Sequence, residues 1–265
     1  MAAWNHSMQF GWDDRTIHAY RFNVGIVAPN HRGDSEDCAD LSMKFLINFA
    51  FMNGLGVSLR NQDGWVYSSR SDMAAPYSMN AVDSRNNSAT WSNRDEFYAA
   101  VKRHINVRAL WQLNTTKNPF GPSPGDLLII YKKTGIFASR HHAGIVCATF
   151  AAGKPHPRAK DTSIPDYPGG DKAMDQKNVT EYFRGTTADH EEGSELSSRL
   201  PDENVHFDYL NSRGDAKRNA ELILFANAKD FQGYGFEFRI YSDTVFDGRV
   251  HDDLRDRVQK GGTAV

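Results

Sequence analysis

The chain has 265 residues, of which 40% are hydrophobic and 24% are charged. That length suits one large domain or two small ones, and the hydrophobic share allows a sizeable core, which excludes a disordered chain, a coiled coil and a collagen-like repeat. The 31 basic and 33 acidic residues nearly cancel. The overall charge therefore predicts no attraction to nucleic acid or to an anionic membrane.

Two cysteines exclude a disulfide scaffold and a four-thiolate zinc site, and we expect neither a cofactor nor a metal. No apolar run approaches about 18 residues, so we expect no membrane insertion. The first residues show neither the basic nor the apolar region of a signal peptide. We therefore expect synthesis in the cytoplasm.

The first part of the chain predicts one strand and one central helix. The apolar and aromatic residues at 16–29 indicate a strand from 20 to 27. Residues 37–53 carry apolar side chains at steps of three and four, and further apolar side chains fill most of the remaining circumference, which is typical of a helix buried in the middle of a domain. Asp34 or Ser35 is expected to cap its start, and Gly54 to follow its end.

The polar stretch at residues 56–90 predicts a loop with one short strand at 65–68, and a second helix is expected over 93–104. After a turn cluster at 118–125, strands are expected within residues 126–131, 143–150, 205–210, 220–226 and 236–240. Helices followed by sequential strands predict an α+β fold with an antiparallel sheet.

We expect a single domain over residues 1–250. Within it, residues 153–203 are rich in proline and charge and predict a polar insertion with at most one helix, near 174–183. Residues 251–265 form a charged tail that is expected to fray.

Cys38 lies in the first turn of the expected central helix. The free backbone N–H groups and the dipole at a helix N-terminus favour a thiolate, which makes a cysteine nucleophilic. Four acidic residues crowd the same turn and oppose this by raising the thiol pKa, so a cationic partner is needed: Asp34, Glu36, Asp37 and Asp40. The alternative is that Cys38 is simply a small buried residue.

His142 precedes a small residue and a glycine at the start of a predicted strand. That position can hold the imidazole at the sheet edge, over the N-terminus of a helix that packs on the sheet. A structural or exposed histidine is the alternative interpretation. Cys147 lies in the middle of the same strand, where alternation turns it away from the face of His142, so we expect it to be a core residue.

Three motifs occur in a characteristic order: Asp-Cys-Ala-Asp-Leu at residues 37–41, Gly-Asp-Leu at 125–127 and His-Ala-Gly-Ile at 142–145. Together they resemble the papain-like cysteine amidases of the NlpC/P60 type and their CHAP relatives. The resemblance implies a papain-like fold in which a buried nucleophile helix packs on an antiparallel sheet. Two features depart from the family: Asp40 replaces a residue that is often glycine, and the interval from Cys38 to His142 is longer than in compact members.

The resemblance also implies a third polar residue that orients His142 from the following strand. His206 is the first choice because the family tolerates His, Asn or Gln there. Asp208 and Asn204 share its face of the strand, so alternation does not choose among the three.

The implied mechanism is nucleophilic attack by Cys38 on an amide carbonyl. His142 takes the thiol proton to leave a thiolate–imidazolium pair and later protonates the leaving amine, while the backbone N–H of Cys38 holds the oxyanion. Tyr20 and Asn30 are the upstream candidates for a second oxyanion donor.

The most favoured function is hydrolysis of an amide bond in peptidoglycan stem peptides by a cysteine amidase or endopeptidase. The acidic residues Asp34, Glu36 and Asp40 are expected to pair with a substrate amino group, such as that of diaminopimelate. The resemblance extends to type VI secretion effectors, which implies an antibacterial toxin that is delivered to the periplasm of a target cell and blocked by an immunity protein. Two alternatives are a papain-like toxin that cleaves or deamidates a protein, and a non-catalytic binding protein in which Cys38 is inert.

Overall fold

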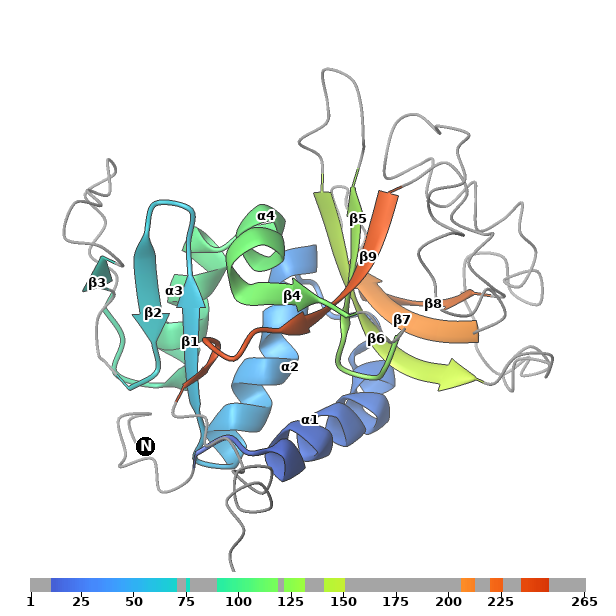
Figure 1. Cartoon of the computed structure of the whole chain (residues 1–265), viewed down its shortest axis with the longest axis horizontal. Coiled ribbons are helices and arrows are strands. Elements are labelled where there is room, and N and C mark those ends of the chain that lie inside the picture. The colour runs from blue at the N-terminus through green and yellow to red at the C-terminus, as the bar shows by residue number, and fades with distance from the viewer. Residues whose placement is uncertain are drawn as a thin grey trace, which may run out of the picture.

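The computed structural model describes residues 11–70, 75–76, 90–118, 122–131, 141–150, 206–212, 220–225 and 235–247. These residues form helices and two antiparallel sheets, so the predicted α+β class is confirmed (Figure 1). The predicted insertion at 153–203, its helix near 174–183 and the tail at 251–265 lie outside the described residues.

The strand expected over residues 20–27 is wrong, because α1 spans Asp14–Val27 and a 3₁₀ turn, η1, follows at Ala28–His31. A capping box starts α1: the Thr16 N–H donates to the Asp13 carboxylate over 2.7 Å, and the Asp13 N–H donates to the Thr16 hydroxyl over 2.8 Å. These two hydrogen bonds satisfy backbone N–H groups that lack a partner at the start of a helix but would not lack one in a strand.

The apolar side chains of α1 explain why this helix is hard to recognise in the sequence. Tyr20, Phe22, Val24 and Ile26 alternate with polar residues or glycine, which is the period of a strand. In the helix, Tyr20 and Val24 are buried one turn apart, whereas Phe22 is 73% exposed and Ile26 is 55% exposed. Only one half of the alternating pattern therefore contacts the core.

The central helix is confirmed as α2, Cys38–Met52. Its N-cap is Asp37 and not Asp34 or Ser35. Gly54 follows the helix with a φ of +65°, as expected for a glycine at the C′ position. Figure 1 shows α2 between the two sheets, and its buried side chains contribute to one hydrophobic core with strands of both.

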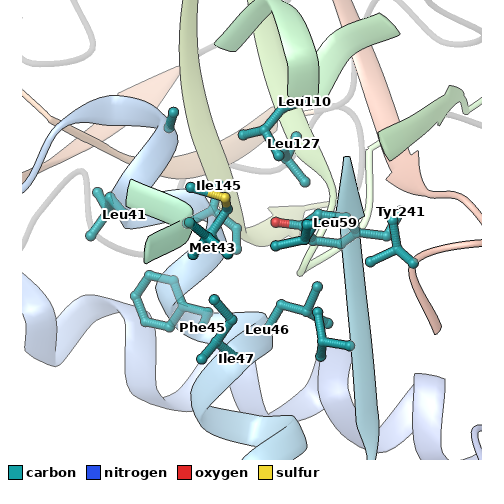
Figure 2. Packing of buried hydrophobic residues seen from close by; sticks show 14 of the residues in the cluster. Leu41, Met43, Phe45, Leu46, Ile47, Leu59, Leu110, Leu127, Ile145 and Tyr241 are labelled. Carbon is teal, nitrogen blue, oxygen red and sulfur yellow. The ribbon is translucent and has the colours of Figure 1, made fainter. Parts of the chain in front are cut away.

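Figure 2 shows this core at close range, with residues of α2 gathered against side chains from both sheets and from the helical turn at residues 110–114. The labelled residues are Leu41, Met43, Phe45, Leu46, Ile47, Leu59, Leu110, Leu127, Ile145 and Tyr241. A helix that is apolar on nearly all sides can fill this position because it meets partners in several directions.

The smaller sheet has the strand order β10-β1-β2-β3. Its strands are β1 Gly56–Arg60, β2 Trp65–Ser68, β3 Ala75–Pro76 and β10 Phe246–Asp247. The strand predicted at 65–68 and the helix predicted at 93–104 are confirmed, the latter as α3, Arg94–His104. The prediction missed β1, β3 and β10, and also the short elements α4 Val107–Ala109 and η2 Leu110–Asn114.

The larger sheet has the order β4-β9-β5-β6-β7-β8, and every described strand pair in it is antiparallel. Its strands are β4 Thr115–Lys117, β5 Leu127–Tyr131, β6 His141–Phe150, β7 His206–Ser212, β8 Ala220–Phe225 and β9 Gly235–Tyr241. The predicted strands after residue 125 are all found here. The sheet brings the start of β6 to the N-terminus of α2.

Asp126, from the Gly-Asp-Leu motif, lies in the turn before β5 and is 1% exposed. Its Oδ2 accepts hydrogen bonds from the Asn118 amide (2.6 Å) and from the Ser123 N–H (2.9 Å), while the Arg21 guanidinium is 3.6 Å from Oδ1. Burial nevertheless raises the pKa of Asp126 to about 6, and Arg21 only partly offsets this.

Asp126→Asn is expected to stabilise the protein at pH 8 by about 1–3 kcal/mol, because the ionised carboxylate costs desolvation energy in the fold. The folded-state pKa of Asp126 lies above that of the unfolded chain, so the folded state holds more protons between about pH 4 and 6, and stability falls as the pH rises through that range. Urea unfolding at several pH values tests this, with Asp63→Asn at an exposed position as the control. Equal pH slopes in wild type and Asp126→Asn would contradict it.

Candidate active site

Cys38 is the first residue of α2 and is 9% exposed. It lies on a groove of about 450 Å³ that is formed by the start of α2, the β1–β2 turn, the end of α3 and the segment leading into α4. The lining residues are Asp37, Cys38, Ala39, Asp40, Gln62, Lys102, Ile105, Asn106, Val107 and Arg108. Cys38 therefore lies beside a space that a substrate can enter.

The surroundings of Cys38 favour the neutral thiol. Burial raises its pKa above the ordinary range, and the negative charge of Asp37 raises it further. The backbone N–H groups of Ala143 and Ala39 act in the opposite direction without reversing the shift. The N-terminus of α2 is thus insufficient to produce a resting thiolate.

Two lysines supply the positive charge that pairs with the acidic residues around the start of α2. Lys44 Nζ is 2.6 Å from Asp34 Oδ2, and Lys102 Nζ is 2.5 Å from Glu36 Oε2. Because Asp34 and Glu36 are paired in this way, the expectation that they bind a substrate amine is not supported. Asp40 also pairs with Lys102, over 3.8 Å from Oδ2 to Nζ, but unlike Asp34 and Glu36 it lines the groove.

His142 is 7% exposed near the start of β6, and its Nε2 is hydrogen bonded to Oδ1 of Asn211 near the end of β7. An amide oxygen only accepts, so Nε2 carries the proton and Nδ1 keeps its lone pair. Burial lowers the pKa of His142 to about 4, although the charge of Asp37 opposes the shift. The neutral imidazole is thus the favoured form, and the expected thiolate–imidazolium pair is not the resting state.

The prediction that His206 orients His142 is wrong. His206 pairs with Phe150 at the far end of β6, eight residues from His142, which is roughly 25 Å along a strand. Asp208 pairs with Ala148, also distant from His142, and Asn204 lies outside the described residues. Asn211 is instead the residue whose side chain is hydrogen bonded to His142.

A sequence signal for Asn211 existed in the strand order. When β7 follows β6 in antiparallel pairing, the start of β6 lies beside the end of β7 and not beside its beginning. The register Gly144↔Asn211 puts Asn211 on the same face as His142. The last polar residue on that face near the end of β7 was therefore the residue to expect beside His142.

Cys38 and His142 belong to adjacent parts of the site. The N–H of Ala143 acts on the thiol, and the carboxylate of Asp37 acts on both the thiol and the imidazole. Alternation, however, turns Ala143 into the core beneath α2 and turns His142 to the other face of the sheet, beside Gly144 and Tyr209. The imidazole is hydrogen bonded to Asn211 and not to the thiol, so direct proton transfer requires the whole His142 side chain to move from this face toward Cys38.

The three predicted oxyanion donors, the Cys38 N–H, Tyr20 and Asn30, are not gathered at one place in the structure. The N–H of Cys38 donates to Asp37 Oδ1 over 2.5 Å, so this donor is occupied by the helix cap. Tyr20 is wrong as a second donor, because its ring packs 5.7 Å from that of Phe49, near the opposite end of α2. Asn30 is exposed in η1 and does not line the groove.

Cys147 is 2% exposed and belongs to the core, as predicted. Over the described ranges there is no group of three or more His, Cys, Asp or Glu side chains that could hold a metal ion. In the same part of the chain, every helix is too short or too polar to cross a membrane.

Comparison with known proteins adds no relative: no family model, no curated protein and no solved structure matches the chain. The interpretation of the site therefore depends on its own chemistry.

Proposed function

We propose that this protein is a papain-like cysteine amidase whose functional residues are Cys38, His142 and Asn211. The observation that carries the proposal is the hydrogen bond between His142 Nε2 and Asn211 Oδ1, formed beside a cysteine that opens a buried helix and lines a groove. A cysteine, a histidine and an asparagine are the set that papain-like enzymes use. The hydrogen bond leaves Nδ1 of the imidazole as the atom that can accept a proton.

In the proposed reaction the neutral pair acts by general-base catalysis. The His142 side chain moves from its position beside Asn211 toward Cys38, and Nδ1 takes the thiol proton as the sulfur forms a bond to the amide carbon. The imidazolium then protonates the nitrogen of the breaking C–N bond, so that the amine leaves and a thioester remains. Water attacks the thioester with His142 as base, releases the carboxylic acid and restores the Cys38 thiol.

The proposed substrate is the stem peptide of peptidoglycan. The groove beside Cys38 carries side chains of both charges, Asp37 and Asp40 with Lys102 and Arg108, and it suits a peptide that has both amino and carboxylate groups. The expectations of delivery to a target periplasm and of an immunity protein that covers this groove remain predictions.

The proposal is tested by digesting purified diaminopimelate-type peptidoglycan and resolving the products by mass. Wild type is expected to release new muropeptides, and Cys38→Ala none, because the nucleophile is lost. Cys147→Ala is the matched control, since this second buried cysteine lies in the core and is expected to leave cleavage intact.

Two negative results would redirect the proposal. If wild type cleaves no muropeptide but iodoacetamide labels Cys38 faster than Cys147, the proposed substrate is wrong and a protein substrate replaces it. If there is neither cleavage nor selective labelling, Cys38 is inert, as in a binding protein, and the amidase proposal fails.

A further inference from the structure

Arg108 is a cation whose charge is not neutralised by any carboxylate in the described part of the chain. It is exposed on α4, lines the groove that contains Cys38, and donates from Nε to the neutral Gln112 Oε1 over 3.3 Å. The other cation of the groove, Lys102, is already paired with Glu36 at 2.5 Å. Arg108 is thus the lining residue with a positive charge to offer a ligand.

The neighbours of Arg108 strengthen this assignment. Asn106, two residues earlier, uses its Oδ1 to cap α4 by accepting from the Ala109 N–H over 2.9 Å. Its amide NH₂ is a further donor group on a residue that lines the groove. A guanidinium and an amide donor that lie close together suit a carboxylate, which accepts through two oxygens.

The charged residues that line the groove belong to different elements. Asp37 and Asp40 lie at the start of α2 beside Cys38, whereas Arg108 belongs to α4. A substrate carboxylate would be repelled by the acidic pair and attracted by the guanidinium. The charge distribution therefore selects where along the groove an anionic group can bind.

We infer that Arg108 determines substrate specificity by binding a carboxylate of the peptide whose amide lies at Cys38. This inference rests on the proposed function, since it takes the groove to be the substrate site. The chemical class that it selects is a peptide with a free carboxylate near the scissile bond, and the amidated form of the same peptide is disfavoured.

The test measures binding without turnover, in the Cys38→Ala background. The probes are the tripeptide L-Ala-γ-D-Glu-meso-diaminopimelic acid and the same tripeptide with its carboxylates amidated, each titrated by calorimetry. The acid is expected to bind at least about fivefold more tightly than the amide, and adding Arg108→Gln is expected to remove that preference. Arg103→Gln, an exposed arginine on α3 outside the groove lining, is the matched control and is expected to retain it.

Each outcome separates the inference from the proposed function. The role of Arg108 would be overturned if both arginine variants lost the acid preference, or if neither of them lost it. Weak and equal binding of both peptides would also overturn it. A preference that depends on Arg108 in a protein that cleaves no peptidoglycan would support the carboxylate site and overturn the proposed hydrolysis of peptidoglycan. Added salt is expected to weaken acid binding more than amide binding, because the contact is between charges.

Discussion

Replacing His142 with alanine is expected to lower kcat by about 10²–10⁴-fold, which is the usual contribution of a general acid or base. Asn211→Ala is expected to cause a smaller fall, because it removes the hydrogen bond to Nε2 but leaves the imidazole in place. The measurement is the initial rate of muropeptide release by variants whose circular dichroism and urea unfolding match those of wild type. An unchanged kcat in folded His142→Ala would remove this residue from the reaction.

Asn211→Asp separates a positioning role from a merely structural one. A carboxylate beside the imidazole favours its cation and is expected to raise the pKa of His142 from about 4. The base form of His142 is then lost at a higher pH, so the acid limb of the kcat/KM profile should move toward neutrality. If the limb stays in place while the variant remains folded, Asn211 does not act on the reaction through His142.

Asp37→Asn is expected to accelerate the alkylation of Cys38 by iodoacetamide at pH 7.5, by up to about tenfold for each pKa unit recovered. The reason is that the charge of Asp37 adds to burial in raising the thiol pKa. Asparagine is itself a favourable N-cap, so the substitution removes charge without removing the helix cap.

Asp40→Asn is the matched control for this experiment. Asp40 also lies in the first turn of α2 and lines the groove, but Asp37 is the acidic residue whose charge raises the thiol pKa. We expect Asp40→Asn to leave the alkylation rate of Cys38 within about twofold of wild type. Equal acceleration by both variants would mean that the groove charge as a whole, and not Asp37, suppresses the thiolate.

The sequence was sufficient wherever an element is determined by its own side chains. The helix over residues 37–53 follows from apolar residues on nearly all sides, and the strands after residue 125 follow from apolar β-branched runs between turns. The same local patterns predict that Cys38 lies at a helix start and that His142 lies at the start of β6.

Only the tertiary structure decided which residues meet. Alternating apolar residues at 20–26 favour a strand locally, but a capped helix buries Tyr20 and Val24 against the core. Antiparallel register brings Asn211 to His142 and carries His206 to the far end of β6. Local pattern specifies an element and its faces, whereas contacts between elements depend on strand register and on burial, which are properties of the whole chain.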